Sequence, residues 1–365
     1  MKRKFLYGLQ VVLLILMPGC GEKLYLEQAS IVLVLGLDKE QDTYKIFHSN
    51  PVFNRQAEEK VDITTATGST LRETTTLINN MTTGKVVGGK LQNILIGKRL
   101  LRKQNAFPLL DVLFRDPKNE TNARVIVVDG PVQDVMYADT QDKGMLGTVI
   151  RDIVESSSKN GTTVLTRLLQ FHRQIFDKRI TPHLSEMTMK NDEITVTGTA
   201  LLDRQGKYAT SLNNKESTLL LLLQGDTKQS VPLMLHQKPG DQEEISINID
   251  NSSVKVSTDF QKGRFVFDIG IQVEASVTER KFPIDWKKET PRTESLLQKQ
   301  VKKECENLVK KIQQHQLDPI GLGIYAKSHR YAEWKRVEKE WGKALSKAKI
   351  TISPEVKIKN YGVSM

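Results

Sequence analysis

Short runs of apolar and polar residues fill the first part of the chain and predict strands. The runs Ser30–Asp38 and Thr43–Phe53 lie on either side of a polar turn, so they predict two neighbouring strands. The run Lys60–Gly68 alternates between apolar and polar residues and predicts an exposed strand. Apolar residues then recur at helical spacing from Leu71 to Met81, which predicts a short amphipathic helix.

The next elements alternate between strand and helix. Leu91–Gly97 is a compact apolar run that predicts a strand, and Arg99–Leu113 predicts a helix that bends near Pro108. Ala123–Gly130 is apolar without alternation, which is typical of a strand buried on both faces. The first part of the chain therefore mixes strands and helices.

Helices and a hairpin follow in the middle of the chain. Met145–Val154 and Thr163–Phe176 predict helices. The runs Glu193–Asp203 and Lys207–Leu212 flank a short turn with a glycine, which indicates a β-hairpin. Asn213–Gly225 predicts a helix that the asparagine caps and the glycine ends.

The last third of the chain predicts strands, two helices and a closing strand. The long helix covers Thr293–Gln316 and the second helix Ala332–Ala348, before a strand over Lys349–Gly362. Three strands are expected ahead of these helices, at Glu244–Asp250, Ser253–Phe260 and Phe265–Val277.

The chain has two cysteines, Cys20 and Cys305, in different surroundings. Cys305 belongs to an apolar stripe on the long helix, where the intervals are four, four, three and four residues. The pattern favours a buried core residue over a reactive thiol. If Cys20 is modified, no intramolecular disulfide can form. The stripe consists of Leu297, Val301, Cys305, Leu308 and Ile312.

The amino-terminal segment has the pattern of a lipoprotein signal peptide. A cationic start precedes the apolar run Phe5–Met17. As a helix this run would span about 20 Å, less than the roughly 30 Å hydrocarbon core of a bilayer. Gly19 then precedes Cys20, as in a bacterial lipobox, although Met17 and Pro18 depart from its usual residues. We expect cleavage between Gly19 and Cys20, with S-diacylglycerol and an N-acyl chain such as palmitate on Cys20; the alternative is an uncleaved signal anchor.

Positive charge is concentrated at the carboxyl-terminal end. The formal net charge is +11, and the segment Lys287–Met365 contains 18 Lys and Arg against 9 Asp and Glu. On an exported protein, such a region indicates an anionic lipid surface or an acidic partner protein, and we expect no nucleic acid. The alternative is an ordinary solvated helix face.

One segment approaches the spacing of a nucleotide-binding loop. Gly84–Leu91 fits G-x-x-x-x-G-K, but Leu91 occupies the position where Ser or Thr binds magnesium. The predicted order is also reversed, because a helix precedes the glycines and a strand follows them. We therefore expect no nucleotide site.

No pattern of catalytic or metal-binding residues emerges from the rest of the chain. The sequence lacks H-E-x-x-H, G-x-S-x-G and an EF-hand loop. Trp334 and Trp341 lie seven residues apart, which favours core packing over ligand binding. We predict no catalytic residue, metal or cofactor. The six histidines lack metal-ligand spacing; they are His48, His172, His183, His236, His315 and His329.

Four segments behind Cys20 together resemble a known family. The last of them contains Asp318 in an Asp-Pro-x-Gly-x-Gly stretch, both tryptophans and the closing strand. This order resembles the Ger(x)C family, the C-subunit lipoproteins of bacterial spore germinant receptors. The four segments are Glu27–Phe53, Gly89–Gly130, Gly198–Gly225 and Leu317–Gly362.

The resemblance implies an elongated α+β protein of three small domains, with mostly antiparallel sheets and packed helices. We place them at residues 20–138, 139–228 and 229–365, after the signal peptide 1–19. It further implies a non-catalytic subunit that Cys20 tethers to the outer face of the spore inner membrane. There it would assemble with two integral-membrane subunits, A-type and B-type, and be required for nutrient-triggered germination.

Two other classes of function stay open at this point. A lipid-anchored solute-binding protein would need a cleft with convergent polar and aromatic groups. An anchored hydrolase would need acids or histidines with perturbed pKa values in a pocket.

Overall fold

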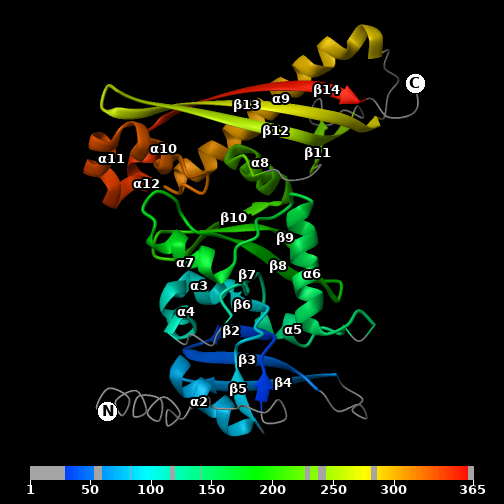
Figure 1. Cartoon of the computed structure of the whole chain (residues 1–365), viewed down its shortest axis with the longest axis vertical. Coiled ribbons are helices and arrows are strands. Elements are labelled where there is room, and N and C mark those ends of the chain that lie inside the picture. Colours follow the sequence, from blue (N-terminus) through cyan, green and yellow to red (C-terminus); the bar gives the residue numbers. More distant parts are fainter. Residues whose placement is uncertain are drawn as a thin grey trace, which may run out of the picture.

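The computed structural model describes residues 29–52, 60–82, 84–115, 120–140, 142–226, 231–236, 244–280 and 286–360. The predicted cleavage and lipidation residues, Gly19 and Cys20, lie outside these residues. The molecule is elongated, with the amino-terminal strands at one end and a carboxyl-terminal sheet at the other (Figure 1). Its mixture of helices and sheets confirms the predicted α+β class.

An eight-stranded sheet forms the larger part of the molecule. Its central pairs, β2–β6, β6–β7 and β7–β8, are parallel, and the pairs on both flanks are antiparallel. A short parallel pair, β1 (Ala29–Ile31) and β5 (Lys85–Val87), lies apart from it. In spatial order the sheet contains β10 (Tyr208–Asn213), β9 (Glu193–Leu202), β8 (His183–Lys190), β7 (Arg124–Val128), β6 (Asn93–Gly97), β2 (Val34–Glu40), β3 (Thr43–Pro51) and β4 (Val61–Gly68).

The sheet crosses the predicted domain boundary at residue 138, because β7 pairs with β8. The hydrogen-bonded pairs run without interruption from β4 at one edge to β10 at the other. The first two predicted domains thus share one sheet, and the division of the chain into three domains stays a prediction.

Helices cover both faces of the eight-stranded sheet, which explains the apolar runs without alternation. In β6, Ile94 and Ile96 pack against the helices of one face, and Leu95 packs against those of the other. A strand covered on both sides needs apolar residues at successive positions. One face holds α3 (Lys98–Lys103), α4 (Ala106–Arg115) and α7 (Leu168–Phe176); the other holds α5 (Val132–Met136) and α6 (Leu146–Lys159).

Two predicted helices begin or break elsewhere than expected. The helix over 99–113 is interrupted at Gln104, whose backbone is extended, and not at Pro108. Pro108 is the third residue of α4, where a missing N–H breaks no helical hydrogen bond. The helix over 163–176 begins only at Leu168, because the preceding residues pair with strands: Val125 N–H donates to the carbonyl of Thr166.

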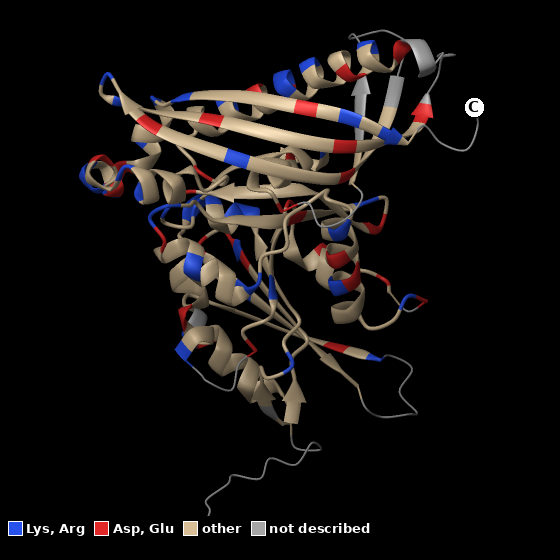
Figure 2. Cartoon of the chain, turned by 45° about the horizontal axis from the view of Figure 1, so that its top comes forward, with Lys and Arg blue, Asp and Glu red and all other residues tan. Residues whose placement is uncertain are grey.

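The carboxyl-terminal sheet has four strands, in the order β11 (Val231–His236), β12 (Glu244–Gln261), β13 (Arg264–Arg280) and β14 (Lys349–Asn360). Two of the three strands predicted here are one continuous strand, β12, with a register shift between Ile249 and Asn251. One face of the sheet packs on helices, and the other carries charged residues of both signs (Figure 2). The helices are α9 (Trp286–Gln314), α10 (Leu322–His329), α11 (Tyr331–Val337) and α12 (Trp341–Ser346).

The predicted helix over 332–348 is divided by a short 3-10 turn, Glu338–Glu340. The guanidinium of Arg204 donates hydrogen bonds to the carbonyls of Glu338 and Lys339, at 2.8 and 3.0 Å. These carbonyls are acceptors that a continuous helix would use itself. The break in the helix therefore coincides with a contact from Arg204, in the turn between β9 and β10.

Helix α8 (Asn214–Gln224) joins the two sheets and follows its sequence pattern closely. Asn213 and Glu216 form a capping box, and Gly225 ends the helix with a φ of 70°. The leucines of its last two turns are buried and contribute to the core of the carboxyl-terminal sheet. Helix α8 is therefore covered on all sides, most completely at Leu219–Leu223. The predicted caps are confirmed.

Helix α2 (Leu71–Met81) lies at the amino-terminal end of the described part of the molecule, beside β4. Thr70 caps it by accepting a hydrogen bond from the backbone N–H of Glu73. Its predicted bounds are confirmed.

Candidate functional site

Charged side chains gather where the central parallel strands end, which is where open α/β sheets commonly bind ligands. Asp38 in β2 is 1% exposed and accepts two hydrogen bonds of 2.7 Å from Arg99. It also accepts from the backbone N–H of Val132, the first residue of α5, at 3.0 Å. A side chain at Gly97 would place its Cβ 2.4 Å from an Asp38 oxygen, so this position requires glycine. The pair fixes the start of two helices against the sheet.

Lys98 forms a second ionic cluster beside the first. Its ammonium lies 2.8 Å from both Asp129 and Glu186 and 4.8 Å from the ring centre of Tyr208. Burial by itself lowers the pKa of Lys98, but the hydrogen bonds to Asp129 and Glu186 outweigh burial and raise it. The lysine therefore stays protonated and cannot act as a nucleophile or a base at neutral pH. Ser211 donates a further hydrogen bond to Glu186.

The Asp-Pro-x-Gly-x-Gly stretch forms a buried turn around Asp318. The carboxylate, 0% exposed, accepts hydrogen bonds from the backbone N–H groups of Gly321, Leu322 and Gly323, at 2.8 to 2.9 Å. It also accepts one of 2.7 Å from the indole of Trp341. The carboxylate is thus engaged by four donors of the fold, and its role is structural.

The two tryptophans and Cys305 are core residues, as their spacing predicts. Trp341 is 1% exposed and packs edge-on against Phe265, while Trp334 is 3% exposed. Cys305 is 0% exposed on the stripe of α9, and burial raises the pKa of its thiol to about 12. A thiol in this state is a poor nucleophile at neutral pH.

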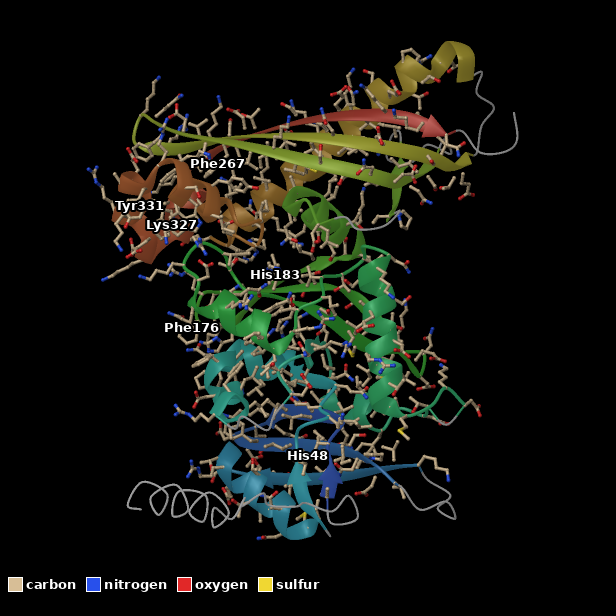
Figure 3. All side chains as sticks on the ribbon, in the orientation of Figure 1. His48, Phe176, His183, Phe267, Lys327 and Tyr331 are labelled. Atoms are coloured by element: carbon tan, nitrogen blue, oxygen red, sulfur yellow. The ribbon has the colours of Figure 1, made fainter. Side chains whose placement is uncertain are left out.

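The histidines are dispersed over the fold, as Figure 3 illustrates for His48 and His183. Burial lowers the pKa of both to about 4, so both rings are neutral near pH 7. His172 packs among Phe107, Phe114 and Phe176. Over the described ranges, no three His, Cys, Asp or Glu side chains are close enough to share a metal ion.

The segment with P-loop spacing lacks the geometry of a phosphate site. Lys85–Val87 forms strand β5, and the chain then continues into strand β6. Leu91 is 3% exposed and belongs to the core. No helix amino end follows these glycines to receive a phosphate.

Helix α9 carries a row of exposed cations, which we call the α9 basic stripe. Arg292, Lys299, Lys303 and Lys310 are exposed and form no ion pair with any described residue. Their intervals of seven, four and seven residues place them on one face, over about 27 Å of helix. Leu296, which is 37% exposed, lies on the same face. Figure 2 shows Lys and Arg residues along α9, which lies at the carboxyl-terminal end of the molecule.

None of the described helices has both the length and the apolar character that a bilayer crossing requires. Residues 1–28, which contain the predicted signal peptide and Cys20, are outside that search.

Sequence reasoning identified the basic end and the buried cysteine and tryptophans, but it missed both ionic clusters. Asp38, Lys98 and Glu186 come from segments up to about 150 residues apart, and only the strand pairing brings them together. The sequence did contain one sign of these clusters: two cations, Lys98 and Arg99, directly follow a buried strand. Buried charges at the end of an apolar strand need partners of opposite charge.

Two protein-family models match consecutive parts of the chain. The model described as spore germination protein N-terminal domain matches residues 22–189. The model described as spore germination B3/GerAC like, C-terminal, matches residues 197–362. Between them they account for nearly the whole chain after Cys20.

Full-length relatives and one solved structure agree with these matches. The chain is 23% identical to spore germination protein GerQC of Bacillus cereus, with 100% of both chains covered. It is 22% identical to spore germination protein B3 of Bacillus subtilis, over 99% of both. The crystal structure of the GerBC protein covers 89% of this chain and 97% of its own, at a TM-score of 0.59 and 18% identity. This last likeness shows the shared fold.

Proposed function

The chain belongs to the Ger(x)C family of spore germination proteins, and from this premise we propose that it is a lipid-anchored, non-catalytic subunit of a spore germinant receptor. Cys20 carries S-diacylglycerol and an N-acyl chain and holds the protein on the outer face of the spore inner membrane. Two integral-membrane subunits, A-type and B-type, are its partners. The observation that carries the proposal is the pair of family matches, of which the first begins two residues after Cys20.

The state of the buried charges supports a role in contacts. Lys98, Asp38 and Asp318 each have their hydrogen-bonding groups engaged by neighbouring residues. Catalytic acids and bases need a reacting group within hydrogen-bond reach. Groups committed to the fold in this way are not available to a substrate.

The α9 basic stripe supports an acidic partner protein over a lipid surface. The nine residues from Cys20 to Gln28 can span at most about 30 Å. Strand β1, which begins at Ala29, pairs with β5; β5 lies at one end of the long axis, and α9 lies at the opposite end (Figure 1). A protein that is tethered near Ala29 therefore holds the stripe away from its anchor, toward the exposed parts of its partners.

Co-isolation from spore membranes tests this proposal. The affinity-tagged full chain, solubilised in detergent, is expected to bring down the A-type and B-type subunits, identified by peptide mass spectrometry. Reversing two charges of the stripe, Lys299→Glu with Lys303→Glu, should reduce the recovery of both by about tenfold, because like charges across an interface repel.

The matched control reverses two exposed lysines of the eight-stranded sheet region, Lys103→Glu with Lys190→Glu. This variant should recover both subunits normally. The proposal would be contradicted if the natural chain were isolated without either membrane subunit. If the two double variants recovered the subunits equally well, the α9 basic stripe would not be the contact surface.

A solute-binding role is the second candidate, because a cavity of about 620 Å³ lies between α6, α7 and α8. Its lining contains no Phe, Tyr or Trp among the described residues. The aromatic groups that typically line such sites are therefore missing.

A further inference from the structure

Two cavities meet at Arg167, just before the first residue of α7. The one described above, of about 620 Å³, extends along α7 toward α8. The second, of about 700 Å³, extends from Arg167 toward the beginnings of β6 and β7. Arg167 lines both cavities, which we together call the hollow; it lies beside α6 and α7. Volumes of this size accommodate small organic molecules.

Three cations of the first cavity are without an anionic partner. Lys159, Arg167 and Arg173 form no side-chain ion pair or hydrogen bond with any residue that the structure describes. Arg167 is half-buried, and the other two side chains are exposed. A partly exposed guanidinium without an acceptor in the fold has its donors available to a ligand.

The acidic groups of the same cavity are engaged elsewhere. Glu155 accepts from Arg124, and Asp177 accepts two hydrogen bonds from Arg179, at 2.7 and 2.8 Å. The third acid, Asp226, is exposed after the end of α8 and also has a partner. The lining thus contains three cations and three acids, and ion pairs with Arg124 and Arg179 neutralise two of the acids. The cations therefore outnumber the acids that remain to balance them.

The floor of the cavity is neutral and hydrogen-bonded within the fold. His183, labelled in Figure 3, donates from Nδ1 to the carbonyl of Thr181 at 3.1 Å. Its Nε2 accepts from the amide of Gln174 at 3.2 Å, and the oxygen of that amide accepts from the backbone N–H of His183. Because burial lowers the pKa of His183 to about 4, the ring adds no charge. The cations thus share the cavity lining with a polar, hydrogen-bonded pair.

The second cavity holds buried polar atoms that lack a partner. The side-chain oxygen of Gln92 and the Nε of Arg124 are both buried without a hydrogen bond, and both residues line this cavity. Only 12% of the Arg124 side chain is exposed. Buried polar groups are normally hydrogen-bonded, so a water molecule or a polar ligand in this cavity would complete the contacts of both atoms.

We propose that this hollow binds a small organic anion, whose carboxylate or phosphate group is held by Arg167 and Arg173. The planar guanidinium fork matches both groups in two-point hydrogen bonds. The polar floor of Gln174 and His183 contacts the uncharged part of the same molecule. This site is separate from the α9 basic stripe and goes beyond the receptor role proposed above.

Isothermal titration of the full-length protein in detergent tests the site. The probes are succinate, inorganic phosphate and glycerol 3-phosphate, with glycerol as the uncharged control. We expect at least one anion to bind at a single site and glycerol not to bind. Arg167→Gln and Arg173→Gln should weaken that binding by about tenfold or more, as the loss of a charge-assisted hydrogen bond does.

Arg72→Gln is the matched control, because Arg72 is exposed on α2, away from the hollow. It should bind the anion as the natural chain does. Arg173 is exposed, so its variant folds even if Arg167→Gln does not, and weakening in either variant supports the site. The proposal is overturned if no anion binds, or if both variants bind it as tightly as Arg72→Gln. Neither result alters the co-isolation experiment, so the two proposals fail separately.

Discussion

The eight-stranded sheet and helix α9 use the same kinds of charged residue in opposite ways. In the sheet, the side chain of Lys98 is 9% exposed and that of Glu186 is 4% exposed, and the two lie 2.8 Å apart. On α9, Arg292, Lys299 and Lys303 are exposed and unpaired with respect to the described residues.

The difference separates two uses of charge. A buried cation must be paired, and its partners then fix the elements that carry them. An exposed cation contributes little to folding and stays available to another molecule. Variants in the sheet should therefore change stability, and variants on α9 should change binding.

The largest expected effect comes from removing the buried cation. Lys98→Met leaves the carboxylate of Glu186 buried beside an apolar side chain, so the free energy of unfolding should fall by about 3–5 kcal/mol. Denaturant unfolding of the full-length protein in detergent measures this. Lys310→Met on α9 is the matched control. A similar loss of unfolding free energy in the two variants would contradict the difference between buried and exposed cations.

A change of pH should produce the next largest effect. His48 and His183 have pKa values of about 4 in the folded protein against 6.5 in the unfolded chain, because burial disfavours their charged forms. Their contribution to stability is complete above pH 6.5 and is lost as the pH falls toward 4, since the unfolded chain then binds more protons. Between pH 7 and pH 5 each should cost about 2 kcal/mol.

His48→Phe isolates one of these two histidines. Nδ1 of His48 is buried without a hydrogen bond, so the phenyl ring removes the titration without breaking a contact of that atom. The fall in unfolding free energy between pH 7 and pH 5 should shrink by about 2 kcal/mol in this variant. An unchanged pH dependence would show that His48 does not titrate with unfolding.

The smallest effect on stability is expected at the stripe itself. Neutralising Lys299 and Lys303 to Gln should change the free energy of unfolding by no more than about 0.5 kcal/mol. The same variant should still lower the recovery of the membrane subunits in co-isolation. A loss of stability comparable to that of Lys98→Met would mean that the stripe is part of the fold and not a contact surface.

The sequence pattern predicted those elements that depend on interactions between residues close together in the chain. The caps of α8, Asn213 and Gly225, were readable because each acts on its own helix end. The strand β7 was readable because its apolar residues have no alternation. The stripe around Cys305 likewise depends only on helical spacing.

Contacts between distant segments explain the elements that were missed. β8 was not predicted, because its inward-facing Ser185 and Glu186 look like surface residues until their partners from elsewhere in the fold are known. The break near Glu338 coincides with hydrogen bonds from Arg204, which is 134 residues away in the sequence. The hollow at Arg167 combines three helices, α6, α7 and α8, and the starts of two strands, which no single stretch of sequence indicates.

The tether at Cys20 is the central claim, and a cysteine comparison tests it most directly. Cys20→Ala and Cys305→Ala would be expressed in sporulating cells, and the full chain followed by membrane fractionation together with nutrient-triggered germination. We predict that Cys20→Ala leaves the membrane fraction and the spores lose their response, whereas Cys305→Ala, altered only in the core of α9, keeps both. A Cys20→Ala chain that stays in the membrane fraction of normally germinating spores would contradict the lipid anchor and the role built on it.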